Sequence, residues 1–326
     1  MIFRLFHSNN PMCLFILVPL VFVLQIPIFF NGFAGPNDTD GFLSLILKNY
    51  MVGYHFLHYT ISVLLILFNV YLIQKIVNIY KMLGNYTYII SFAFVLLNSF
   101  FIVFIIDLST TIAITLLLLL LYYYIFLFER NFSLKTAFNI GLILGFGTLF
   151  YKSFIVFFLL AFWGIISFRS DFIKLIFNLL IGAFVPFYFL FTYMYLNSID
   201  ISLGKMFPSF HLLYINGQDF NAMNVLYLTV FFGILIQGFL KIRASLTTML
   251  IFNRNIYNAI SLAIVLVIIS FFLTNQITLS SLHLMIVPVS FMMPYVLKDY
   301  KKKWLPDLYF WVLVFLVLFN TLVFKN

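Results

Sequence analysis

The stretch STTIAITLLLLLLYYYIFLF, from Ser109 to Phe128, runs for 20 residues without a charged side chain. A helix of about 20 apolar residues is long enough to cross the hydrocarbon core of a bilayer. The rest of the chain is similar, since 64% of its 326 residues are hydrophobic and 8% are charged. A soluble domain has about 25% charged residues. So few charges cannot cover a surface that faces water, and the sequence therefore predicts an integral membrane protein.

Apolar stretches of this kind recur along the whole chain. Charges, prolines and polar clusters divide it into about eleven, near 11–31, 54–74, 86–106, 109–128, 136–151, 153–168, 173–195, 224–240, 256–274, 280–297 and 305–324. Within lipid the backbone must satisfy its own hydrogen bonds, and the alternation of barrel strands is absent, so each stretch should be a helix. We therefore predict an all-α polytopic transmembrane bundle of about eleven spans, with a single membrane domain over 1–326.

The basic residues indicate the orientation of these spans. With the N-terminus in the cytoplasm, only four of the 18 Lys and Arg fall on the outer side, namely Lys48, Lys152, Lys205 and Lys325. The others fall on the inner side, as the positive-inside rule requires. They are Arg4, Lys75, Lys81, Arg130, Lys135, Arg169, Lys174, Lys241, Arg243, Arg254, Lys298, Lys301, Lys302 and Lys303. Because they are spread over separate segments, they favour contact with anionic lipid over binding of nucleic acid.

Groups able to do chemistry gather on the predicted outer side. Five acids lie there, although acids contribute little to topology, and so do four of the five histidines. The acids are Asp38, Asp40, Asp107, Asp200 and Asp219, and the histidines are His55, His58, His211 and His283. This sidedness makes the non-cytoplasmic face the expected place of a functional site.

Asp38 and Asp40 follow the first span in the stretch GPNDTDGFLSLILKNY. One interpretation is structural: Asp38 turns the chain after Pro36, and Asp40 caps a short interfacial helix that places Lys48 at the lipid headgroups. The other is functional, because a carboxylate pair can bind a divalent cation or act as a general base. The spacing of the two acids leaves both interpretations open.

Asp107 and Lys152 are the next candidates. Asp107 precedes the fourth span, where it either caps that helix or adds a second acid to the outer face. Lys152 lies between two short apolar stretches, where it either extends to the headgroups or holds a lipid phosphate. Gly141 and Gly145, in the stretch before Lys152, predict close packing of helices.

Other polar residues are weaker candidates for contact with a substrate. His55 and His58 are three residues apart, so they share a helix face and could ligate a metal together with Asp38 or Asp40. The long outer loop adds His211, Gln218 and Asp219. The amides of Asn98, Asn139, Asn178 and Gln237 lie within predicted spans, where buried polar groups often serve transport.

The order of these features resembles the integral-membrane glycosyltransferases of the GT-C fold. That order is a first span, an outer loop with an acidic pair, an interfacial helix, a second span, an acid after the third span, and a Gly-rich hairpin with a basic residue. The resemblance covers roughly 1–195, a GT-C-like module of seven spans, and leaves 196–326 as an outer loop plus four variable spans. The chain is also similar to multi-pass membrane proteins of Bacteroidota.

The resemblance implies transfer of a sugar from a polyprenyl-phosphate donor at the outer face of a bacterial inner membrane. It assigns catalysis to Asp38, Asp40 and Asp107, and binding of the donor phosphate to Lys152. No cofactor is implied beyond this lipid-linked sugar, except that the first acids hold a divalent metal in some members. Two other functions stay open: a transporter of lipid or solute, and a non-catalytic subunit with protein partners in an envelope secretion or motility assembly.

Overall fold

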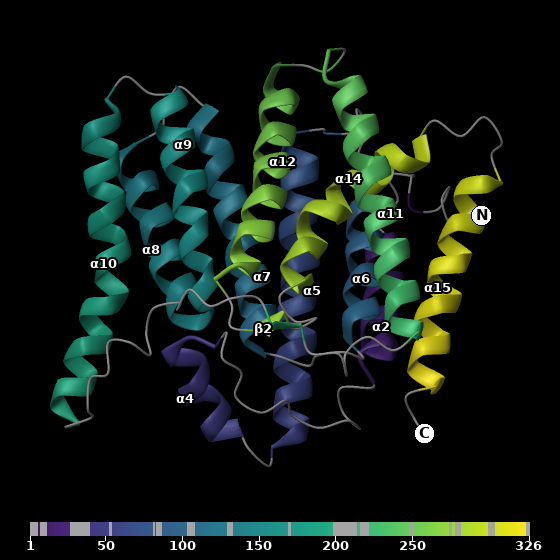
Figure 1. Ribbon diagram of the computed structural model, residues 1–326, viewed down its shortest axis with the longest axis horizontal. Coiled ribbons are helices and arrows are strands. Elements are labelled where there is room, and N and C mark those ends of the chain that lie inside the picture. Colours follow the sequence, from purple (N-terminus) through teal and green to yellow (C-terminus); the bar gives the residue numbers. More distant parts are fainter. Residues whose placement is uncertain are drawn as a thin grey trace.

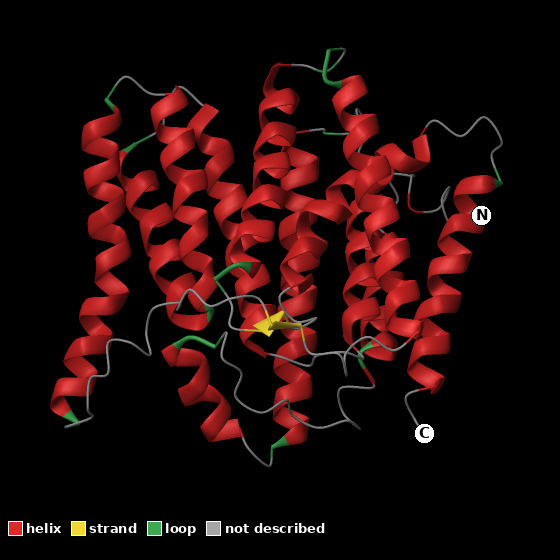
Figure 2. Ribbon diagram, in the orientation of Figure 1, coloured by secondary structure: helices red, strands yellow, loops and turns green. Residues whose placement is uncertain are grey.

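Helices make up almost all of the structure, a computed structural model of the chain (Figures 1 and 2). It describes residues 6, 12–26, 40–51, 54–80, 82, 87–102, 108–128, 133–168, 171–197, 214–215, 222–247, 249, 251–273, 276–277, 282–298 and 304–323. The α-helices are α2 (Met12–Leu24), α4 (Phe42–Met51), α5 (His55–Tyr80), α6 (Ile89–Ile102), α7 (Leu108–Ile125), α8 (Leu134–Phe150), α9 (Phe158–Phe168), α10 (Phe172–Leu196), α11 (Ala222–Ser245), α12 (Ile251–Phe271), α14 (Ile286–Lys298) and α15 (Leu305–Val323). Short 3₁₀ turns are η1 (Phe126–Phe128), η2 (Lys152–Phe157) and η5 (His283–Met285).

Each predicted apolar stretch contains one of these helices, which confirms the all-α class. Four described segments are long and apolar enough to cross a bilayer: His55–Ile79, Phe172–Leu196, Leu228–Ser245 and Asn253–Phe271. The other apolar helices are shorter, with 10–17 residues each in the segments that the structure describes. The membrane character is therefore supported, and the number of about eleven spans stays a prediction.

The centre of the bundle is formed by α6 and α14, which pack against each other. All side chains from Ile89 to Ser99 and from Leu282 to Leu297 are buried. Helices α5 and α15 pack on α6, and α11 packs on α14. A helix that is apolar on all sides is stable when it is enclosed in this way.

The rim of the bundle exposes large apolar side chains, most clearly on α10. This helix packs on α8 and α9 along one side only. Its exposed large apolar residues are Phe172, Ile173, Phe177, Leu180, Ile181, Phe184, Tyr188, Phe189, Tyr193, Tyr195 and Leu196. A soluble protein rarely leaves so large an apolar area in water, whereas lipid tails would cover it in a bilayer.

Glycines bring α8 and α10 close together, as the sequence predicts. A Cβ atom on Gly141 would overlap the carbonyl oxygen of Leu179, and one on Gly145 would overlap that of Ala183. On α10, a Cβ atom at Gly182 would overlap the carbonyl oxygen of Phe138. The backbones therefore approach more closely than any larger residue allows, as in small-residue interfaces of membrane helices.

The two ends of the bundle differ in charge. Helix α4 lies at one end, below the ends of α8 and α9 in Figure 1, and we call this the α4 end. Lys48 of α4 and Lys152, which follows α8, belong to the α4 end. Six other described basic residues lie within the first turn or the last two turns of helices at the opposite end, namely Lys75, Lys135, Lys174, Lys241, Arg243 and Arg254. This separation agrees with the segmentation, and the compartment that each end faces stays a prediction.

Two short strands join distant parts of the chain. β1 (Tyr214–Ile215) lies between α10 and α11, and β2 (Gln276–Ile277) follows α12. They pair in parallel, with Tyr214 opposite Gln276 (Figure 2). The connection after α10 is therefore tied to the connection after α12.

Candidate functional site

The carboxylate of Asp40 is fully buried and accepts hydrogen bonds from Lys48 and Ser109. Lys48 donates from Nζ to Oδ2 of Asp40 at 2.5 Å, and Ser109 donates from Oγ to Oδ1 at 2.6 Å. Asp40 is 0% exposed and Lys48 is 2% exposed. Burial of a carboxylate is costly unless it is paired and hydrogen-bonded, and both conditions are met here. We call Asp40, Lys48 and Ser109 the Asp40 cluster.

The backbone around Asp40 is fixed by the turn that follows α8. Asp40 forms an antiparallel bridge with Tyr151, and the amide of Gly41 donates to the carbonyl of Phe150 at 2.9 Å. A Cβ atom on Gly41 would overlap the carbonyl group of Leu149. Glycine is therefore required where α4 begins, because the backbone of α8 occupies the space of a side chain.

We expect Gly41→Ala to destabilise the protein by about 1–3 kcal/mol, as overpacking does. The added methyl group must push the start of α4 away from Leu149, and Asp40 would move with it. The measurement is the thermal unfolding midpoint in detergent. Asn49→Ala, on the exposed side of the same helix, is the control, and equal midpoints for the two variants would contradict the expectation.

Lys48 corrects the expectation that this residue reaches the lipid headgroups. Its ammonium reaches back along about two turns of helix to the carboxylate of Asp40, which precedes α4. The sequence interpretation assumed that an isolated cation on an interfacial helix would extend toward phosphates. The buried carboxylate of Asp40 is the stronger partner, because attraction between opposite charges increases as water is excluded.

Lys152 begins η2, directly after the residue that bridges Asp40. Its side chain is partly exposed, whereas Tyr151 and Ser153 on either side are buried. The structure thus brings the segment of Asp40 and the segment of Lys152 together, as the sequence analysis expects. A cation at this position could reach a ligand that approaches the α4 end.

A second polar cluster adjoins the first through the consecutive residues Ser109 and Thr110 at the start of α7. His283 lies 3.2 Å from the hydroxyl of Thr110 through Nδ1, and 2.8 Å from Oδ1 of Asn98 through Nε2. With the Asn98 oxygen facing Nε2, these contacts fit the tautomer that carries its proton on Nε2 and accepts the Thr110 hydroxyl at Nδ1. We call Asn98, Thr110 and His283 the His283 cluster; all three are buried.

Of the other predicted site residues, the structure describes only His55 and His58. Asp38, Asp107, His211, Gln218 and Asp219 lie outside the described residues. His55 is exposed, whereas His58 is buried. Within the described parts of the chain, no three His, Cys, Asp or Glu side chains form a group that could hold a metal ion.

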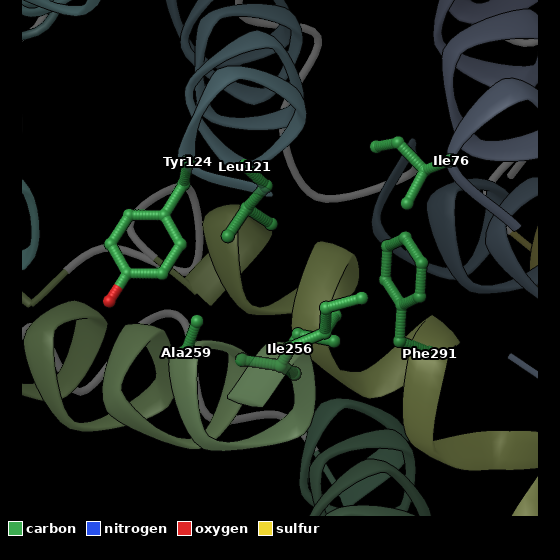
Figure 3. Close-up of a pocket in the computed structure, with 7 residues that line it drawn as sticks. Ile76, Leu121, Tyr124, Ile256, Ala259 and Phe291 are labelled. Carbon is green, nitrogen blue, oxygen red and sulfur yellow. The ribbon is translucent and has the colours of Figure 1, made fainter. Parts of the chain in front are cut away.

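The small cavity shown in Figure 3 does not serve as the site. Ile76, Leu121, Tyr124, Ile256, Ala259 and Phe291 line it between α5, α7, α12 and α14. Its volume is about 10 Å³, which is room for about one water molecule. The hydroxyl of Tyr124 points away from the other labelled side chains (Figure 3). This space is a packing gap in the core.

Comparison with known proteins assigns no family: no protein-family profile, no curated protein and no solved structure matches the chain.

Sequence reasoning missed the roles of Ser109, Lys48 and His283. Ser109 looked like one of several hydroxyls at the start of a span, and it lies 69 positions from Asp40 along the chain. His283 and Asn98 are 185 positions apart. One signal was present, because Asn98 is an amide within a predicted span, where a polar side chain needs a partner.

Proposed function

We propose that the protein is an integral membrane glycosyltransferase-like enzyme that transfers a sugar from a polyprenyl-phosphate donor. In the predicted orientation, the α4 end faces the non-cytoplasmic side of a bacterial inner membrane. The donor and the acceptor would meet there, beside Asp40 and Lys152. Asp38 and Asp107 remain candidates for the same site.

The observation that carries the proposal is the position of Asp40. Neighbours from α4, from α7 and from the turn after α8 fix it: Lys48, Ser109, Tyr151 and, through Gly41, Phe150. A carboxylate that is paired with an ammonium, next to a segment with a second cation and a cluster with a buried histidine, provides the groups that acid–base chemistry on a phosphate-linked substrate needs.

During this reaction Lys48 would first contact Asp40 and then the phosphate of the donor. Without a donor, its ammonium neutralises Asp40. The phosphodiester of an arriving donor would attract the same ammonium, since Lys offers three donors on a flexible stem. Loss of the Lys48 contact would leave Oδ2 of Asp40 with a lone pair for an acceptor hydroxyl. The ion pair would thereby keep the base ionised until the donor is bound.

The chemical step balances with these groups. The acceptor oxygen forms a bond to the anomeric carbon of the sugar, and its proton passes to Asp40. The bond from the anomeric carbon to the phosphate oxygen breaks, and polyprenyl phosphate leaves with the electron pair. Lys152 and Lys48 would neutralise the charge that develops on this phosphate. A separate general acid is unnecessary because phosphate is a good leaving group.

The experiment uses two variants in membranes supplied with polyprenyl-phosphate mannose, glucose and N-acetylglucosamine. The variants are Lys152→Ala and the charge-neutral pair Asp40→Asn with Lys48→Met. We expect both to insert and fold while transfer of the radiolabelled sugar is lost. Lys135→Ala, on an exposed residue at the opposite end, should keep wild-type transfer. Absence of transfer by the wild type would rule out the enzyme, and wild-type transfer by the charge-neutral double variant would rule out Asp40 and Lys48 as its catalytic residues.

A second candidate is a non-catalytic subunit of an envelope assembly. The complete burial of Asp40 favours it, because an ion pair that joins α4 to the bundle could be purely structural. In that case the wild type would transfer no sugar, and the protein would co-purify with fixed partners. The transfer assay on the wild type therefore separates the two functions.

A further inference from the structure

A groove between α2 and α5 lies away from the candidate site. Its volume is about 530 Å³, within the range of about 300–1,000 Å³ that ligand sites occupy. Its walls are mainly apolar along their length, with Leu14, Leu17, Val18, Leu67, Val70 and Tyr71 among the lining residues. The polar lining residues Gln74, Lys75 and Asn78 are all near the end of α5 that is opposite to the α4 end.

The length of the groove fits one leaflet of a bilayer. Its lining on α5 extends from Leu67 to Ile79, which is about 18 Å at the helical rise of 1.5 Å per residue. Half of the hydrocarbon core is about 15 Å thick. An acyl chain could therefore lie along the apolar walls with its headgroup beside Lys75.

The polar end of the groove offers hydrogen-bond donors. Gln74 is fixed, since it donates to Asn78 Oδ1 at 2.8 Å and to the Thr87 carbonyl at 3.2 Å, and accepts from Ser91 at 3.0 Å. The oxygen of Asn78 is thus occupied, and its NH₂ group has no partner among the described residues. Lys75 lies over the ring of Tyr122, 4.8 Å from its centroid, and the described residues pair it with no carboxylate.

We propose that this groove binds one anionic phospholipid, with an acyl chain between α2 and α5 and the phosphate at Lys75 and Asn78. An ammonium and an amide NH₂ group are donors only, so they select an acceptor such as phosphate. The cation next to an apolar wall favours a lipid with net negative charge over a zwitterionic one. In the predicted orientation this lipid belongs to the cytoplasmic leaflet, and its binding is independent of the proposed sugar transfer.

The test is native mass spectrometry of the delipidated full chain, titrated with phosphatidylglycerol or phosphatidylcholine. For the wild type we expect the first bound lipid to be phosphatidylglycerol with a preference of about fivefold, the effect of one cation near an anionic headgroup. Lys75→Gln should remove this preference. Lys174→Gln, on an exposed lysine at the same end of the bundle, should keep it.

A second variant tests the apolar wall. Leu67→Trp fills the groove at its deep end and should lower binding of the first lipid for both headgroups. Unchanged unfolding midpoints in detergent would show that the variants are folded. The proposal is overturned if Lys75→Gln keeps the wild-type preference, or if Leu67→Trp binds its first lipid as the wild type does.

Discussion

Removing one charge of the buried ion pair should destabilise the protein by about 3–5 kcal/mol, whichever partner is changed. Lys48→Met leaves the Asp40 carboxylate buried with its Ser109 contact and without the Lys48 ammonium. Asp40→Asn leaves the Lys48 ammonium in the same enclosed place beside a neutral amide. In both variants a buried charge loses this partner where water cannot replace it, and that is the source of the loss.

Changing both residues together should restore most of the stability. In the double variant the amide oxygen that Asp40→Asn introduces can still accept from Ser109, and the methionine keeps the apolar stem of Lys48. Replacing a buried ion pair by neutral groups of similar volume is often close to neutral. We therefore expect the stability of the double variant to lie within about 1 kcal/mol of the wild type. The double variant would then lose much less stability than the two single variants lose together, and this difference is the coupling energy between Asp40 and Lys48.

The measurement is reversible unfolding in mixed micelles by titration with a denaturing detergent. Lys174→Met, on an exposed and distant lysine, is the control, and its effect should be within about 0.5 kcal/mol. If the losses of the two single variants simply add in the double variant, Asp40 and Lys48 do not act as a pair.

Gly141→Ala should weaken the attachment of α10, with a loss of about 1–3 kcal/mol. The new methyl group would overlap the Leu179 carbonyl oxygen, which belongs to a backbone and cannot turn aside. Gly182→Ala should act similarly from the other helix, against the Phe138 carbonyl oxygen. The effect is large because one side of α10 holds it to the bundle, while the other side faces lipid.

Gly233→Ala is the matched control for this interface. Gly233 is also inside a membrane helix, α11, but a Cβ atom there would meet nothing within 4 Å. Its replacement should leave stability unchanged or raise it by up to about 1 kcal/mol, since alanine loses less backbone entropy in a helix. Thermal midpoints in detergent compare the variants. Equal midpoints for Gly141→Ala and Gly233→Ala would show that the α8–α10 backbones are not in close contact.

The helical class and the positions of the helices could be predicted because both depend on local sequence. Ser109–Phe128, for example, carries no charged side chain over its whole length and is mostly apolar, and α7 with η1 covers it. The close-packing glycines were also predictable on one helix, because their spacing is local. Their partner Gly182 was not, since nothing in the sequence pairs α8 with α10 in advance.

The candidate site was predictable only in outline. The sequence singled out Asp40 and Lys152, and the structure joins their segments through the bridge from Asp40 to Tyr151. The sequence did not indicate that Lys48 would neutralise Asp40. A lysine on an interfacial helix can also contact a lipid phosphate, and only the fold places Lys48 beside Asp40 instead. His55 and His58 share a helical spacing, yet one is exposed and the other is buried.

The sequence by itself determined that this is a helical membrane protein with basic residues concentrated at one end of its helices. Composition and length are enough for this, because the bilayer forces apolar segments into helices. The tertiary structure alone decided which polar side chains meet: Asp40 with Lys48 and Ser109, and His283 with Asn98 and Thr110. Those contacts arise from the packing of helices that are far apart in the chain, and a buried polar group is stable only beside the partner that packing supplies.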